Sequence, residues 1–263
     1  MIYCRKDRKI CETLLRASRR RGGDVKPLSE LIVEVGRRFV GTPYEAETLE
    51  REGPEELVIN LRAFDCVTFI EAAVALALSV RARKTDFFDY AAVLERLRYR
   101  RGRCDGYPSR LHYFTDWLYD SGRKGMVRDV TGEIGGFPFR KEFYVLTSRR
   151  EAHPPLKDAA AFRRMRLLEA ACSRRTLYRI PKNDLKRYGG KIADGDIVGI
   201  AADTEGIDVS HAGIAVRGRR GLHLLHASSE AGRVVLSDVT LYRYLRARRS
   251  RIGVIVGRTI PPA

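Results

Sequence analysis

The chain has 263 residues, of which 44% are hydrophobic, and this length suits one large domain or two small ones with a sizeable core. The composition excludes disorder as the default, and no run reaches the ~18 apolar residues of a membrane helix. The formal net charge of +17 predicts attraction to polyanions such as nucleic acid, an acidic membrane surface or an anionic cell-wall polymer.

The first part of the chain is typical of helices joined by turns. Residues 6–20 are compatible with a short amphipathic helix that ends at residues 21–23, Arg-Gly-Gly. Over residues 27–39 the apolar side chains recur at the spacing of a second helix. Residues 41–44 then form a turn, and the Leu-Val-Ile run at residues 57–59 suggests a short strand.

A cysteine stands between a polar loop and an Ala/Leu-rich run that extends to about residue 81. The run has strong helix propensity, so Cys66 is predicted at or just before the N-terminus of a buried helix. Unpaired backbone N–H groups and the helix dipole favour a thiolate there, which is one way to make a nucleophile. The alternative is an inert core cysteine, because free cysteines are among the most buried residues.

The middle of the chain is predicted to be mostly helical with one irregular insert. Helical patterns cover residues 86–99, 111–119 and 157–173. Residues 122–139 suggest turns and short strands, and residues 142–147 suggest one further strand.

The last part of the chain differs, because short apolar or alternating runs are separated by Gly, Asp and Ser, as expected of an antiparallel meander. These runs are residues 196–200, 211–216, 222–227, 233–236 and 252–256. One helix is predicted among them at residues 239–246. The whole pattern predicts a single α+β domain over residues 1–263, with helices at about 1–180, including an insert at about 82–180, and a sheet at about 181–263.

A cysteine nucleophile needs a base, usually a histidine that a third group orients. The chain has five histidines, and its five cysteines contain no CxxC pair, so neither a zinc site nor a disulfide framework is predicted. His211 opens one predicted strand. On the next strand His223 and His226 are an odd number of positions apart, so only one of them can share a face with His211.

Five short motifs follow one another in a fixed order. They are Gly41-Thr42-Pro43-Tyr44, Asp65-Cys66, Asp194-Gly195-Asp196-Ile197-Val198, His211-Ala212-Gly213-Ile214-Ala215 and Leu225-His226-Ala227-Ser228. This order resembles the NlpC/P60 superfamily of papain-like cell-wall hydrolases. Residues 107–114, 178–182 and 206–211 resemble one subgroup, the DUF1460 or N-acetylmuramoyl-L-alanine amidase-like family.

The resemblance implies a papain-like fold in which a helix carrying the nucleophile Cys66 packs on an antiparallel sheet. It implies His211 as the base that becomes an imidazolium and His226 as the orienting residue, and the pairing is expected to lower the pKa of the thiol well below its free value of ~8.5. Tyr44 matches a tyrosine that lines the site and is expected to bind substrate or help hold the oxyanion. Asp65 is a further candidate for substrate binding, with capping of the helix as the alternative.

One departure from the superfamily pattern limits which reaction the resemblance implies. Ordinary NlpC/P60 peptidases have Ser-Gly after the Asp-Cys pair, in a region that helps to bind a free amine, whereas residues 67–68 are Val-Thr here. The resemblance therefore implies an N-acetylmuramoyl-L-alanine amidase that cleaves the lactyl–L-Ala amide of small, especially 1,6-anhydro, muropeptides. The insert would supply a sugar-binding wall from Arg110, Tyr113, Phe114 and Trp117, with core packing as the alternative for Phe114 and Trp117.

Two other functions stay open. A γ-D-glutamyl–diamino acid endopeptidase would use the same chemistry, and a catalytically dead basic module would bind nucleic acid or anionic glycan. The basic clusters are not interleaved with an RNA-type aromatic motif, so no nucleic-acid partner is expected. No cofactor or metal is implied, and a monomer is expected. The resemblance points to the bacterial cell envelope or periplasm, while the lack of an apolar signal-peptide run after Met1 leaves a cytoplasmic location open.

Overall fold

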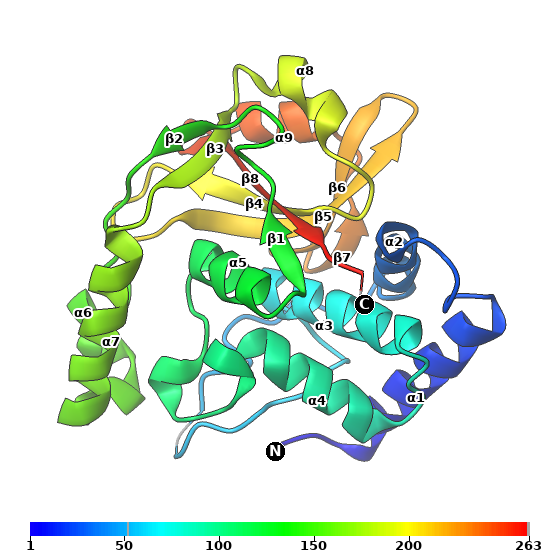
Figure 1. Ribbon diagram of the computed structural model, residues 1–263, viewed down its shortest axis with the longest axis horizontal. Coiled ribbons are helices and arrows are strands. Elements are labelled where there is room, and N and C mark those ends of the chain that lie inside the picture. The colour runs from blue at the N-terminus through cyan, green and yellow to red at the C-terminus, as the bar shows by residue number, and fades with distance from the viewer. Residues whose placement is uncertain (52, 262–263) are drawn as a thin grey trace.

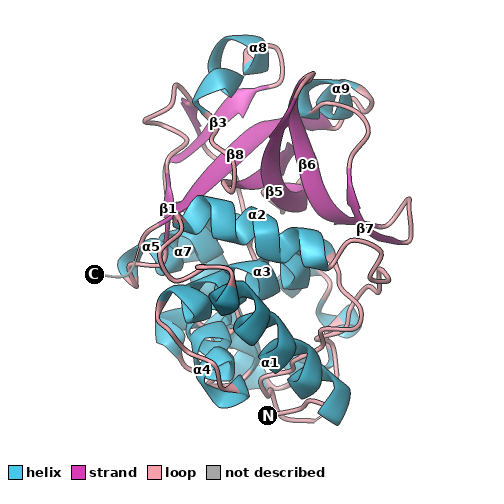
Figure 2. Ribbon diagram, turned by 90° about the vertical axis from the view of Figure 1, so that its right-hand side faces the viewer, coloured by secondary structure: helices cyan, strands magenta, loops and turns pink. Residues whose placement is uncertain are grey.

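A layer of helices covers one face of an antiparallel sheet in the computed structural model, which describes residues 1–51 and 53–261 (Figure 1). The longer helices are α1 (Arg5–Arg20), α2 (Leu28–Arg38), α3 (Cys66–Arg81), α4 (Phe87–Arg98), α5 (Phe114–Arg123) and α7 (Ala159–Ser173). The shorter helices are α6 (Val145–Ser148), α8 (Leu185–Tyr188) and α9 (Leu241–Arg246). Helices α8 and α9 lie on the opposite face of the sheet from α2 and α3 (Figure 2).

The sheet orders its strands β2-β3-β8-β4-β5-β6-β7, and β1 also pairs with β8. The strands are β1 (Val127–Asp129), β2 (Phe137–Phe139), β3 (Leu177–Pro181), β4 (Ile197–Ala202), β5 (Val209–Gly218), β6 (Gly221–Ser228), β7 (Arg233–Leu236) and β8 (Arg251–Thr259). Each of these pairings is antiparallel. The predicted α+β class and the predicted meander from β4 to β7 are therefore confirmed.

Helix α3 is the centre of the structure. It is apolar on nearly every side, and all its residues from Thr68 to Val80 are buried. A helix of this kind has to be covered on all sides. Helices α1, α2 and α4 cover it from the helical layer, while β5 and β6 cover its remaining side. This packing fixes the N-terminus of α3 relative to the two strands.

The strands at the other end of the sheet correct the predicted division of the chain. Strands β1 and β2 confirm the short strands expected at residues 122–139. Together with β3 they belong to the sheet rather than to a separate helical part, since β1 and β3 pair with β8 and β2 pairs with β3. The sheet thus takes strands from both sides of α7. The run at residues 57–59 forms only an isolated bridge between Val58 and Ile2.

The prediction of a strand at residues 142–147 is wrong, because this segment contains the short helix α6. The backbone N–H groups of Leu146 and Thr147 donate to the Glu169 carboxylate on α7, at 3.1 and 3.4 Å. This tertiary contact satisfies donors that a strand would have paired in a ladder. Across the described ranges of the chain, no helix is long and apolar enough to span a membrane.

The close approach of α5 to the sheet gives a test of the packing. A Cβ atom on Gly199 of β4 would lie 2.5 Å from a ring carbon of Phe114 and 2.9 Å from Val209. Gly199→Ala should therefore reduce the free energy of unfolding by about 1–3 kcal/mol, measured by urea denaturation. Gly190→Ala is the control, because nothing lies within 4 Å of its added Cβ, and equal losses in the two variants would contradict this packing.

Candidate active site

Cys66 is the first residue of α3, as the sequence predicts, and Asp65 caps the helix. The Asp65 Oδ1 atom accepts from the backbone N–H groups of Val67 (2.9 Å) and Thr68 (2.7 Å). In return the backbone N–H of Asp65 donates to Thr68 Oγ1 at 2.9 Å, which completes a capping box. The capping interpretation of Asp65 is confirmed, and this reciprocal cap holds the cysteine in a fixed backbone position.

Two histidines from neighbouring strands form the second part of the site. His211 Nε2 on β5 and His226 Nδ1 on β6 are 2.6 Å apart, with the two rings nearly perpendicular at 82°. His223 faces the other side of the sheet, where its Nδ1 lies 2.8 Å from the carbonyl oxygen of Ser237. The parity argument from the sequence is confirmed: His226, and not His223, meets His211.

Cys66 and His211 line the same cavity, which has a volume of about 160 Å³. Its wall comes from α3, from β5 with the loop before it, and from the insert. The lining residues are Cys66, Val67, His112, Tyr113, Phe114, Val145, Leu146, Ile207, Asp208, Val209, Ser210, His211 and Ala212. Most of these side chains are apolar, so a ligand that binds here would be desolvated where it contacts the thiol and the imidazole.

The electrostatic state of the pair differs from the sequence-based expectation. Burial raises the pKa of the Cys66 thiol to about 12, and the negative charge of Asp65 adds to this effect. Burial likewise lowers the pKa of His211 to about 3, assisted by His226 and by Arg251. The expected lowering of the thiol pKa is therefore wrong for the unliganded protein. The site holds a neutral thiol and a neutral imidazole, which is the protonation state that a general base requires.

Tyr44 lies beside the segment that leads to Cys66. Its backbone forms a parallel bridge to Phe64, two residues before Cys66. Burial raises the pKa of the Tyr44 hydroxyl, and a charge on Cys66 would raise it further, so the hydroxyl keeps its proton at neutral pH. It thus remains a hydrogen-bond donor, although Tyr44 is not among the residues that line the cavity of Cys66 and His211.

The three remaining candidates from the sequence have different surroundings. Tyr113 lines the cavity, but its hydroxyl donates to Glu169 at 2.6 Å. Trp117 is only 2% exposed and stacks on Phe114 in the core. Arg110 is buried in an ion-pair cluster, and neither Arg110 nor Trp117 lines the cavity of Cys66.

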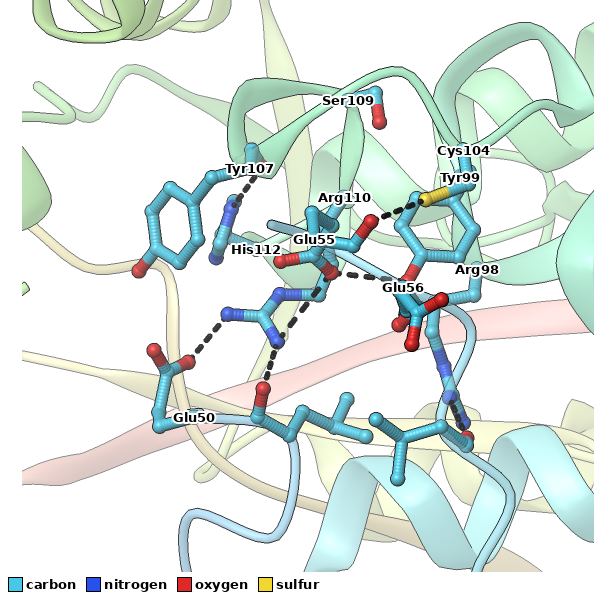
Figure 3. A network of polar contacts seen from close by, with 12 residues as sticks. Glu50, Glu55, Glu56, Arg98, Tyr99, Cys104, Tyr107, Ser109, Arg110 and His112 are labelled. Atoms are coloured by element: carbon cyan, nitrogen blue, oxygen red, sulfur yellow. Dashed lines mark hydrogen bonds and ion pairs between the residues drawn. The ribbon is translucent and has the colours of Figure 1, made fainter. Parts of the chain in front are cut away.

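Arg110 connects the insert to the loop that precedes Cys66 (Figure 3). Its guanidinium pairs with Glu50 and Glu55 and donates to the carbonyl oxygen of Leu49 at 2.8 Å. Nearby, Arg98 Nε donates to Glu71 on α3 at 2.7 Å, with both side chains buried. These contacts attach the loop and the insert to α3, the helix that begins at Cys66.

Two further residues lie near the histidines: Tyr244 carried no signal in the sequence, whereas Asp208 belongs to the motif at residues 206–211. The Tyr244 ring lies 6.2 Å from the His211 ring and 5.7 Å from the His226 ring. Asp208, which lines the cavity, accepts from the backbone N–H and the hydroxyl of Thr115 at 2.6 and 2.7 Å and thereby ties α5 to the start of β5. Only the folded chain brings these residues together. In the part of the chain that the structure describes, no group of three His, Cys, Asp or Glu side chains could hold a metal ion.

The chain matches the profile of the AmiA-like family, described as N-acetylmuramoyl-L-alanine amidase-like, over residues 34–254. This match covers most of the chain, so the protein belongs to that family, as the motifs suggested. None of the curated proteins matches the chain.

Several solved structures are similar to this chain. An N-acetylmuramoyl-L-alanine amidase from Bacteroides uniformis is 35% identical, with a TM-score of 0.84 over 88% of this chain and 98% of that one. A putative xylanase from Bacteroides fragilis is 39% identical, with a TM-score of 0.81 over 86% and 99%. The DUF1460 protein LPG0564 from Legionella pneumophila is 21% identical, with a TM-score of 0.71 over 97% and 94%, and it shows the fold alone. The family and the similar structures together support an amidase-like hydrolase.

Asp65→Asn should make the Cys66 thiol more acidic without removing the cap. Asn caps helices about as well as Asp, but it lacks the charge that raises the thiol pKa. Since one pKa unit changes the thiolate fraction about tenfold, iodoacetamide at pH 8 should alkylate Cys66 several-fold faster, up to about tenfold. Peptide mass spectrometry measures the rate, with Cys104 as the internal control, and an unchanged Cys66 rate would contradict the assigned effect.

The histidine pair should stay uncharged at mildly acidic pH. Burial lowers the pKa of His211 to about 3 and that of His226 to about 4, below the ordinary value of 6.5. The unfolded chain therefore binds more protons between about pH 4 and 6.5, so this contribution to stability is complete above pH 6.5 and decreases as the pH falls. Ring-proton NMR should show no titration of either histidine between pH 5 and 8; a midpoint above 6 for either one is the contrary result.

Proposed function

We propose that the protein is a cysteine hydrolase of peptidoglycan fragments with an NlpC/P60 papain-like fold. The reaction is that of an N-acetylmuramoyl-L-alanine amidase, which cleaves the lactyl–L-Ala amide of muropeptides, including 1,6-anhydro forms. One observation carries the proposal: in a member of the amidase-like family, Cys66 at the start of α3 lines one cavity with His211, which His226 contacts from behind. Residues 1–263 act as a single domain, as a monomer and in the cell envelope.

The reaction begins from the neutral pair. His211 removes the proton of the Cys66 thiol as the sulfur attacks the lactyl carbonyl carbon. The resulting tetrahedral oxyanion accepts hydrogen bonds from the backbone N–H of Cys66 and from the Tyr44 hydroxyl. The imidazolium of His211 then protonates the L-Ala nitrogen, the C–N bond breaks, and a thioester remains on the sulfur. His211 next removes a proton from water, which attacks the thioester and releases the acid and the thiol.

His226 determines which nitrogen of His211 is the base. Two neutral imidazoles that share one hydrogen bond share one proton. His211 can accept the thiol proton through Nδ1 only if its Nε2 carries the proton donated to His226 Nδ1, across the 2.6 Å contact. His226 thus orients the ring and, after proton transfer, remains the acceptor for the imidazolium.

The lining of the cavity supports the amidase over an endopeptidase. Val67, which stands where peptidases of the superfamily have Ser, is part of the wall. An apolar wall favours a substrate that has no charged amine next to the bond that is cut. The lactyl–L-Ala amide fits this wall, because the nitrogen of its L-Ala is part of the amide and is not a free amine. Tyr113 and Phe114 of the insert form the adjoining wall, where the sugar part of the acyl group would lie.

The bond that is cut decides between the two reactions. Incubation with a defined 1,6-anhydromuramyl tripeptide should release the intact L-Ala-led peptide and the free anhydro sugar acid, identified by mass spectrometry. Release of the diamino acid alone would show a γ-D-glutamyl endopeptidase. If no product were released at all, the proposal that the protein is an enzyme would be contradicted.

Variants of the pair give the matching control. Cys66→Ser and His211→Gln should each lower kcat/KM by at least about 10³-fold, since the acyl-transfer step loses its nucleophile or its base. His223→Gln serves as the matched control, because His223 faces the opposite side of the sheet, and it should retain the parent rate within about twofold. A Cys66→Ser variant that hydrolyses at the parent rate would contradict the cysteine mechanism.

A further inference from the structure

A second cavity of about 200 Å³ adjoins the first one, because Ser210 and His211 line both. His211 lines both cavities, whereas Cys66 lines only the first. The lining of the second cavity is polar and comes from β5, β6, α9 and the segment that leads into β8. It consists of Ser210, His211, His226, Ser228, Ser229, Glu230, Tyr244, Arg248, Ser250 and Arg251.

Arg251 is an unusual member of this lining. It is only 9% exposed, its guanidinium donates to the carbonyl oxygen of Tyr244 at 2.7 Å, and its central carbon lies 3.8 Å from the Tyr244 ring. None of the described carboxylates forms an ion pair with it, since Glu230 pairs instead with Arg248, and that pair is exposed. A buried cation without a counter-ion costs free energy. A ligand that brings a negative charge into the cavity would therefore be favoured.

The direction of the proposed reaction assigns this cavity to one part of the substrate. During the reaction the acyl group is bonded to the Cys66 sulfur, so it occupies the first cavity. The leaving amine takes its proton from His211, so the peptide that it leads has to lie next to the imidazole. The second cavity adjoins the first at Ser210 and His211, so it is the polar space beside the imidazole that the leaving peptide can enter.

We propose that the second cavity binds a carboxylate of the leaving peptide, such as that of an acidic residue following the L-Ala. Arg251 is the principal binding residue, and Tyr244 holds its guanidinium in place. The Ser228 oxygen accepts from the backbone N–H of Ala231 at 3.1 Å, which leaves its own proton free to donate to the same carboxylate. This inference rests on the proposed function, because it takes the leaving group from that reaction.

The test compares two ligands on a Cys66→Ala protein, which cannot turn them over. One ligand is N-acetylmuramyl-L-Ala-D-Glu, and the other is its diamide, in which both glutamate carboxylates are amides. Calorimetry should show the diacid binding about 10–100-fold more tightly, the range for a hydrogen-bonded charged group. Adding Arg251→Gln should abolish this preference by weakening only the diacid, while Arg251→Lys should keep part of it.

Arg249→Gln is the matched control, because Arg249 lies two residues away in the same segment but does not line the cavity, and it should keep the full preference. Equal affinity of the parent for the two ligands would overturn the proposal, and so would an Arg251→Gln variant that weakens both ligands equally. A wild-type protein that cuts another bond would contradict the proposed function while leaving this preference intact, so the two failures are distinguishable.

Discussion

The burial of α3 is the constraint on which the candidate site depends. The helix is covered by three other helices and by β5 and β6, so its first residue cannot move relative to the strands that carry the histidines. The Asp65–Thr68 capping box closes the helix at that residue. Each fully buried large side chain of the helix, such as Phe69 or Leu76, contributes roughly 1.5–3 kcal/mol. The same packing that stabilises the fold therefore also brings the thiol and the imidazole to one cavity.

This burial also determines the protonation of the site. A thiol and an imidazole that are both largely withdrawn from water favour their neutral forms, and Arg251 strengthens this preference at the histidines. An ion pair would then form only as the thiol proton moves during attack on a bound carbonyl. The arrangement protects the resting thiol from reagents, since reactivity depends on the thiolate. Arg251 thus has two effects in the account: it favours a neutral base and provides positive charge for a ligand.

Local patterns in the sequence were sufficient to predict the helix and the strands closest to Cys66. The apolar run after Cys66 predicted the helix, and the odd separation of His223 and His226 showed that only one of them can share a face with His211. The family resemblance then named His226 as that residue. The motifs also led to the family that the comparisons support. The pKa of the thiol was mispredicted, because the helix N-terminus was considered without the desolvation that burial imposes.

What the sequence could not provide depends on contacts between distant segments. Short strands were expected at residues 122–139, but their place in the sheet depends on distant partners, because β1 and β3 pair with β8 and β2 pairs with β3. Segment 142–147 has strand-like composition, but Glu169 on α7 binds its backbone donors. Arg110 belonged to a motif, yet its burial with Glu50 and Glu55 emerges only after folding. Tyr244 and Arg251 were likewise not identifiable, since nothing in their local sequence indicates the histidines.

The central claim is that the Cys66 sulfur becomes acylated, and intact-protein mass spectrometry after rapid acid quench tests it most directly. During turnover of an anhydromuramyl peptide, the account predicts a protein population heavier by the anhydromuramyl acyl group, attached to the peptide that contains Cys66. Hydroxylamine should remove this group, as it does for thioesters. Turnover without any such adduct under single-turnover conditions, or an adduct on another residue, would contradict the account.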